Sequence, residues 1–124
     1  MARTDLELNQ VAAESESRFE SPMLVLTADV TKEEEVESAI SEAVKKMGGI
    51  DLLVNNAGGA SPKLPAHEQP IADFRKLLEL NVVAPTIVSQ AVLRQSMLEA
   101  KSGHIINISS RAGKVGLPSI LPYV

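Results

Sequence analysis

One serine and one tyrosine stand where proton-transfer chemistry is possible. Ser110 follows the apolar, β-branched run 105–108, which is typical of a short buried strand that opens into a loop. Tyr123, the only tyrosine, lies beyond a loop rich in Gly and Pro. Parallel α/β sheets bind ligands at the carboxyl ends of their strands, so the hydroxyl and the phenol could converge on one small site. Alternatively, Ser110 caps local backbone and Tyr123 is an ordinary half-buried aromatic.

Two further strand ends carry polar or small residues. The apolar run 50–54 predicts a strand, and the following Asn56, Ala57 and Gly58 would let a flat ligand lie against the backbone, although an Asn-Gly turn explains them as well. Residues 23–28 predict another buried strand, with Asp29 at its carboxyl end.

Helices must connect and position these strands. A weak helical pattern covers residues 4–16, and Thr31 with Glu34 matches a capping box that predicts a helix ending at Gly48. Its apolar stripe, which we expect to be core, consists of Val36, Ile40, Val44 and Met47. After a Pro-rich loop over 61–70, a long helix is expected to about residue 100, with Pro85 distorting it near Asn81. The apolar face of this helix is expected to comprise Phe74, Leu77, Leu78, Val82, Val88, Val92 and Leu98.

These pieces, in this order, resemble the short-chain dehydrogenase/reductase family over residues 1–124. The resemblance is carried by residues 29–31, 51–58, 81–82 and 103–110 and by Tyr123. It implies one α/β domain over residues 1–124, a Rossmann-like doubly wound parallel sheet. The fold is expected to be incomplete, with its first strand and Gly-rich turn before residue 1 and its C-terminal part, including the catalytic Lys, beyond residue 124.

The resemblance also implies roles for individual residues. Tyr123 would donate or accept the substrate proton, Ser110 would polarise the substrate oxygen, and Asn81 would hold a water in a proton relay. The residues implied in coenzyme binding are Arg3, Asp29, Val30, Asn56, Ala57, Gly58 and Tyr123. A basic residue at the position of Arg3 pairs with the 2′-phosphate of NADP, so we expect NADP rather than NAD.

The implied activity is reduction of a carbonyl or oxidation of a secondary alcohol on a small molecule. A phenol is a poor base at neutral pH without a nearby positive charge, so efficient catalysis is expected to fail without the family's Lys. The predicted strands correspond to the family's third, fourth and fifth. Without the first strand and most of the second, the third would stand roughly 14 Å from the fourth. The strand edges exposed by this gap predict a marginal or aggregation-prone chain. The alternative function is a truncated, non-catalytic fragment that pairs with a full-length relative, or one without independent function.

Composition limits the other classes of function. The chain has 44% hydrophobic and 23% charged residues and a net charge of −4, so a nucleic-acid surface is not expected. It has no cysteine, and its two histidines do not suggest a metal site. No apolar run approaches the roughly 18 residues that a membrane span needs, and no secretory signal begins the chain. We therefore expect a cytoplasmic protein, and a homo-oligomer is one arrangement that it could adopt.

Overall fold

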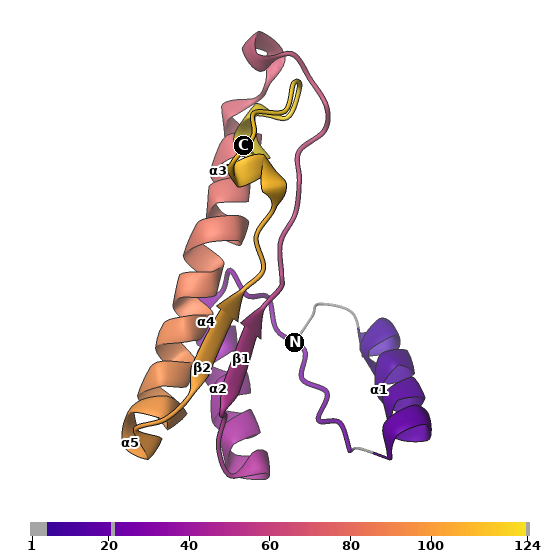
Figure 1. Ribbon diagram of the computed structural model, residues 1–124, viewed down its shortest axis with the longest axis vertical. Helices are drawn as coiled ribbons and strands as arrows, with labels where there is room; N and C mark the ends of the chain where they lie inside the picture. The colour runs from indigo at the N-terminus through magenta and orange to yellow at the C-terminus, as the bar shows by residue number, and fades with distance from the viewer. Residues whose placement is uncertain (1–4, 21, 124) are drawn as a thin grey trace.

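The computed structural model in Figure 1 describes residues 5–20 and 22–123. Helix α1 spans Asp5–Phe19 and α2 spans Glu33–Met47, and strands β1 and β2 span Leu52–Asn55 and His104–Asn107. The long helix between the strands is built from α3 (Ile71–Leu78), α4 (Ala84–Val92) and α5 (Leu98–Ala100). Single turns of 3₁₀ helix occur at Ala66–Glu68, Arg111–Gly113 and Leu121–Tyr123.

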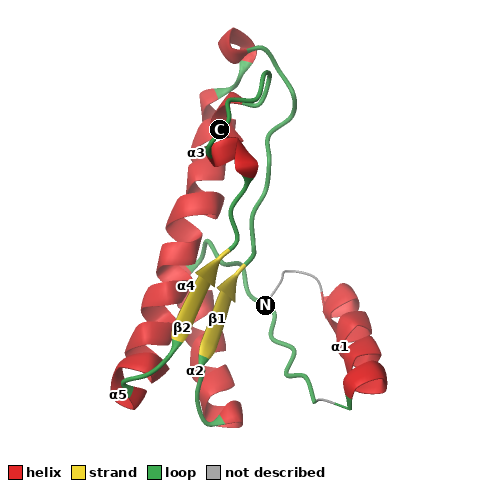
Figure 2. Ribbon diagram, in the orientation of Figure 1, coloured by secondary structure: helices red, strands yellow, loops and turns green. Residues whose placement is uncertain are grey.

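The sheet described by the structure consists of β1 and β2, which run parallel and side by side (Figure 2). In their register Leu53 lies opposite Ile105, and both pack against the hydrophobic core. The next residue on each strand, Val54 and Ile106, points to the opposite face of the sheet, and these side chains are 48% and 45% exposed. Helices therefore cover one face of this pair of strands, and the other face is apolar and open.

The prediction of a strand over residues 23–28 is wrong. The segment is extended, but only Thr27 makes a bridge of the kind found in sheets. A strand is stabilised by neighbours that accept and donate its backbone hydrogen bonds. Among the described residues the sheet consists of β1 and β2, and this segment is not one of its strands.

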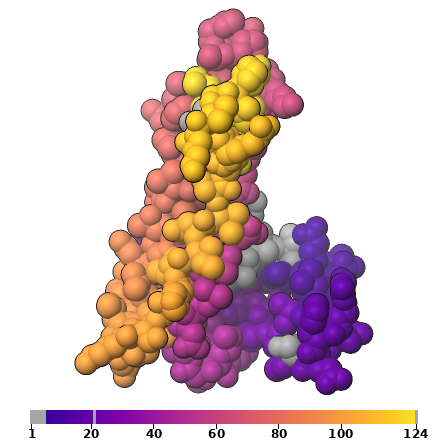
Figure 3. Space-filling view, viewed as in Figure 1, coloured from indigo at the N-terminus to yellow at the C-terminus, as the bar shows by residue number. Residues whose placement is uncertain are grey.

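Helix α1 confirms the expected N-terminal helix and extends beyond residue 16. None of its side chains from Leu6 to Phe19 is buried. In Figure 3 its atoms, in indigo, form a lobe beside the rest of the molecule. The weak apolar pattern of this helix thus produces local structure without a packed face.

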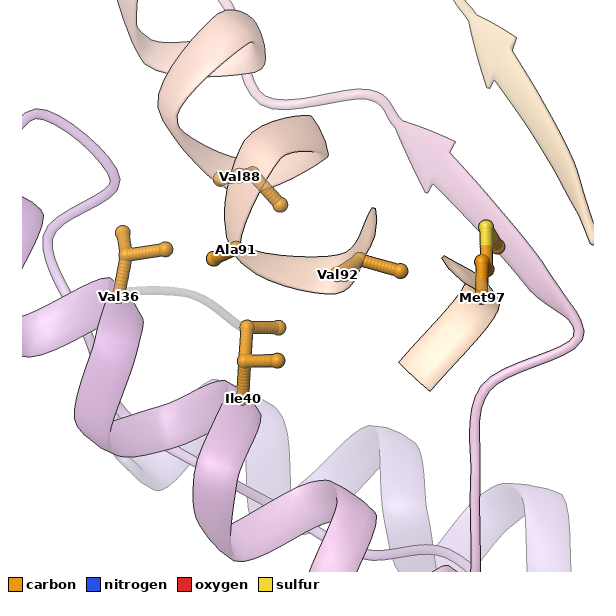
Figure 4. Packing of buried hydrophobic residues seen from close by; sticks show 6 residues of the cluster. All are labelled: Val36, Ile40, Val88, Ala91, Val92 and Met97. Carbon is orange, nitrogen blue, oxygen red and sulfur yellow. The ribbon is translucent and has the colours of Figure 1, made fainter. Parts of the chain in front are cut away.

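The core lies between α2 and α4. Val36 and Ile40 on α2 face Val88, Ala91 and Val92 on α4, as Figure 4 shows. Part of the predicted apolar stripes does not reach this core, because its members lie near helix ends or on the outer face of the long helix. The exposed members are Met47, Leu78, Val82 and Leu98.

Polar side chains fasten the long helix to its neighbours. Ser96, which is buried, accepts a hydrogen bond of 2.8 Å from the backbone N–H of Ile50 just before β1. The carboxylate of Glu37 on α2 accepts hydrogen bonds from the side chains of Arg94 and Gln95, the latter at 2.5 Å between Nε2 and Oε2. These contacts fix the position of the long helix along its axis relative to β1 and α2.

The distortion expected near Asn81 is confirmed. The residues Glu79–Val83 form a π-helical turn immediately before Pro85, which lies in the first turn of α4. A proline lacks the N–H that would bond to the carbonyl four residues earlier, so the helix is forced out of its regular pattern there. A second π-helical turn, Leu93–Met97, has no proline and was not predicted from the sequence.

The whole helix Ile71–Ala100 is long and apolar enough to cross a membrane by length and composition alone. On those two criteria the expectation that no such stretch exists is wrong. Core helices of globular proteins pass the same test, and Val88 and Val92 of this helix are buried against α2. Its apolar composition is therefore weak evidence for a membrane.

Gly103 provides a test of the packing at the entry to β2. Its φ of +148° disfavours other residues, and a Cβ there would lie 2.6 Å from Cγ and Sδ of the buried Met97. We expect Gly103→Ala to lower the free energy of opening of β2 by about 3 kcal/mol, measured by amide hydrogen exchange. Gly116→Ala, where a Cβ meets nothing within 4 Å, is the matched control and should change it little. Equal exchange in the two variants would contradict this account.

Candidate active site

A cavity of about 610 Å³ lies between three parts of the chain: the turn before α2, the end of β1 with the residues after it, and the long helix. Five of the residues predicted to bind the coenzyme line it together, namely Asp29, Val30, Asn56, Ala57 and Gly58. The opposite wall is formed by Leu80, Ala84, Pro85 and Val88. Residues far apart in the sequence therefore meet at the carboxyl end of β1, as expected for a parallel sheet.

Asp29 shapes the turn that enters α2. Its Oδ1 accepts hydrogen bonds from the backbone N–H and the hydroxyl of Thr31, at 3.0 and 2.8 Å. The carboxylate of Glu35 reaches back and accepts from the N–H of Asp29 at 2.8 Å. The predicted capping box of Thr31 and Glu34 is wrong, because Thr31 turns toward Asp29 and the residue before the helix, Lys32, makes no side-chain cap.

Asn55, at the end of β1, ties both strands to the long helix. Its Nδ2 donates to Oδ1 of Asn107 at 2.8 Å and to Oγ of Ser89 at 3.0 Å, and it lies 3.4 Å from the carbonyl of Pro85. Ser89 in turn donates to that carbonyl at 2.6 Å. The sequence analysis singled out Asn56 for the coenzyme and missed Asn55, Ser89 and Asn107. An Asn near the carboxyl end of each predicted strand is a signal for Asn55 and Asn107, whereas Ser89 has no such signal in the sequence.

Asn81 lies in the π-helical turn and holds the segment that follows β1. Its Nδ2 donates to the carbonyl of Gly59, and its Oδ1 accepts from the N–H of the same residue, both at 2.9 Å. Neighbouring Gly58 leaves room for this contact, since a Cβ there would come within 3.3 Å of Oδ1 of Asn81. The side chain of Asn81 therefore positions one wall of the cavity.

Ser110 and Tyr123 are both half-buried. Oγ of Ser110 accepts a hydrogen bond of 3.2 Å from the N–H of Ala112 and caps the 3₁₀ turn Arg111–Gly113. Tyr123 lies in the 3₁₀ turn Leu121–Tyr123, which packs against α3. Among the residues that the structure describes, no hydrogen bond joins the side chains of Asn81, Ser110 and Tyr123 to one another. Arg3 lies outside the described residues.

Metal ligands do not gather in the described part of the chain. No group of three or more His, Asp or Glu side chains among residues 5–20 and 22–123 is placed to hold an ion. His67 is exposed in the 3₁₀ turn Ala66–Glu68, and His104 begins β2.

A family comparison agrees with the motifs and the fold. The family described as short chain dehydrogenase matches residues 1–124 of this chain. The chain belongs to the short-chain dehydrogenase family. The resemblance predicted from the motifs is thereby confirmed, and the family is one of oxidoreductases.

Several curated proteins are similar to this chain. It is 39% identical over 95 residues to the 2-dehydro-3-deoxy-D-gluconate 5-dehydrogenase of Formosa agariphila, covering 77% of this chain and 35% of that protein. It is 38% identical over 99 residues to the L-fucose dehydrogenase of Bos taurus, covering 80% and 36%. Identity to the 5-keto-D-gluconate 5-reductase of Escherichia coli K12 is 39% over 95 residues, covering 77% and 37%. The chain spans about a third of the length of these relatives.

Solved structures establish the fold class. NAD⁺-bound xylitol dehydrogenase superposes with a TM-score of 0.92 at 32% identity, over 98% of this chain and 47% of that one. An actinorhodin polyketide ketoreductase with NADPH superposes with a TM-score of 0.88 at 31% identity, over 98% and 46%. The predicted class, an α/β Rossmann-like fold of which the chain forms part, is confirmed.

Proposed function

We propose that this chain supplies the coenzyme cavity and catalytic side chains of an oxidoreductase that transfers hydride between NAD(P)(H) and a carbonyl or secondary alcohol. The observation that carries the proposal is the cavity in which Asp29, Val30, Asn56, Ala57 and Gly58 lie together. The motifs assign these same residues to the coenzyme. The names of two similar structures, which report bound NAD⁺ and NADPH, support a nicotinamide coenzyme.

The residues present suit an adenosine group. Two hydrogen bonds from Thr31 fix the plane of the Asp29 carboxylate, a group with about four lone-pair positions that suits an amino donor such as that of adenine. Ala57 and Gly58 offer a surface without bulk on which a flat ring can lie. The cavity volume of about 610 Å³ lies within the range of small-molecule sites, roughly 300–1,000 Å³.

The catalytic roles remain those implied by the motifs. A bound nicotinamide ring would accept or supply the hydride. Tyr123 would give or take the proton of the substrate hydroxyl, and the Ser110 hydroxyl would hydrogen-bond the substrate oxygen. Since the side chain of Asn81 is engaged with Gly59, its part in a proton relay would be played by its main-chain carbonyl, which Pro85 cannot satisfy in the α-helical manner.

The finer properties of the enzyme stay predictions. We propose NADP(H) over NAD(H) from Arg3, and a cytoplasmic location. The names of the relatives refer to fucose and to gluconate derivatives, so polyhydroxylated carbonyl compounds are the first substrates to try.

Equilibrium binding of NADPH and NADH to the purified chain tests this function. We expect NADPH to bind in the micromolar range and Asp29→Ala to weaken it about tenfold or more, because a hydrogen bond to a charged group contributes about 1.5–3 kcal/mol. Thr31→Val is the matched control: it removes a hydroxyl that supports the same turn but leaves the carboxylate in place. Equal weakening by both variants would assign the effect to the turn rather than to Asp29.

A second function is favoured by the uncovered apolar face of the sheet. Leu52, Val54, Ile106 and Ile108 are all at least 45% exposed, as expected of a chain that pairs with a longer relative without catalysing a reaction. If neither nucleotide binds at millimolar concentration and the chain co-purifies with a full-length subunit, this second function replaces the first.

A further inference from the structure

The loop between β1 and α3 is hydrogen-bonded to the segment that carries Tyr123. The N–H of Leu64 donates to the carbonyl of Ser119 at 2.9 Å, and Nε2 of Gln69 approaches the same carbonyl at 3.4 Å. Gln69 also donates to the carbonyl of Pro62 at 3.0 Å and lies 3.4 Å from that of Leu64. One amide therefore spans the loop and the C-terminal segment.

The bonded carbonyl belongs to a residue in an unusual conformation. Ser119 has a φ of +66° and follows Pro118 in a turn. A non-glycine residue in the left-handed region costs on the order of 1 kcal/mol and persists where its surroundings hold it. The chain then enters the turn Leu121–Tyr123, in which the N–H of Tyr123 donates to the carbonyl of Ile120 at 2.9 Å. The conformation of Ser119 thus decides where Tyr123 lies.

The orientation of the Gln69 amide follows from its surroundings. Its nitrogen faces three carbonyl oxygens, and reversing the amide would turn Oε1 toward those acceptors. Oε1 is buried and has no hydrogen-bond partner among the described residues. A buried acceptor without a partner costs about 1–3 kcal/mol, so the donor group is the useful end of this side chain.

We propose that Gln69 is a positioning residue for Tyr123, acting through the carbonyl of Ser119. The inference rests on the proposed function for the role of Tyr123 in proton transfer. It adds that the loop over 61–69 and the phenol move together: a substrate that rearranges this loop also displaces the proton-transfer group.

The single tyrosine makes this coupling measurable without coenzyme or substrate. In protein labelled with 3-fluorotyrosine, ¹⁹F NMR gives one resonance, from Tyr123. Gln69→Glu keeps the shape of the side chain but replaces the donor with an acceptor facing three carbonyl oxygens. We expect the resonance to move most of the way to its position in urea, while the helical circular dichroism stays that of the parent chain. Gln90→Glu, the same change at an exposed site on α4, should leave the resonance in place.

Two outcomes would overturn the proposal. One is an unchanged resonance position and line width in Gln69→Glu; the other is a parent resonance that already coincides with that in urea. If Gln69→Glu unfolds the chain, Gln69→Leu replaces it, since it removes the donor without adding a charge, and the same shift is expected. If the parent chain binds no nucleotide but the Tyr123 resonance still shifts in the Gln69 variants, the proposed function is rejected and the positioning role of Gln69 stands.

Discussion

Replacing Val92 with Asp is expected to destroy the folded core of the chain. Val92 is fully buried, at 0% exposure, and packs with Val36 and Ile40 across the α2–α4 contact (Figure 4). An unpaired carboxylate in this place costs more than about 4 kcal/mol, which is a large part of the stability of any small domain. Amide hydrogen exchange in α2 and α4 should accelerate to the rates of an unfolded chain.

Val82→Asp is the matched control, because it makes the same substitution on the same long helix. Val82 is 57% exposed and lies in the π-helical turn, so protection of α2 and α4 should change by less than about 1 kcal/mol. Retained protection in Val92→Asp would show that the α2–α4 contact does not form the core of the folded chain.

The same substitution at two neighbouring asparagines is expected to impair two different properties, strand stability at Asn55 and nucleotide binding at Asn56. Asn55→Asp removes the donor that joins Asn107 and Ser89 and places a carboxylate against their oxygens. We expect a loss of about 3 kcal/mol in the free energy of opening of β1 and β2, measured by hydrogen exchange. The loss exceeds that of an ordinary hydrogen bond because Asn55, Ser89 and the Pro85 carbonyl form one directed chain of donors and acceptors.

Asn56→Asp should leave stability within about 1 kcal/mol, because the side chain of Asn56 is exposed. It lies in the cavity with Asp29, so a second carboxylate there should weaken NADPH binding about tenfold by repelling an anionic ligand. If Asn56→Asp destabilises the strands as much as Asn55→Asp, the assignment of strand stability to Asn55 and of nucleotide binding to Asn56 is wrong.

Elements whose signals are local could be predicted from the sequence. Helix α2 has an apolar stripe and a terminal Gly48 with φ of +85°, and both strands that form are short apolar runs. The effect of Pro85 follows from its missing N–H alone. The segment 23–28 has an equally good strand pattern, but a pattern alone does not place a segment in the sheet of β1 and β2.

The site residues that directly follow a predicted strand could be predicted from the sequence. Asp29 and Asn56 both follow predicted strands, and they line one cavity even though the first of those strands does not form. Asn55, Ser89 and Gln69 were not found, because their partners are distant in the sequence and depend on the register of β1 with β2. The capping box failed for a local reason: the hydroxyl of Thr31 donates to Asp29, two residues earlier.

The parallel pairing of β1 with β2 also dictates the order in which the molecule assembles. Asn55 and Asn107, which face each other at the strand ends, are 52 positions apart, and closing so long a loop has an entropic cost that is recovered only when both strands pair. The 30 residues of the intervening helix form through local contacts and shorten that distance first. During synthesis β2 is the last of these elements to leave the ribosome, so α2 can already pack against α4 while β1 still lacks the strand with which it pairs. Chaperone binding to nascent chains that end before residue 104 should therefore be strong and should fall once β2 has emerged.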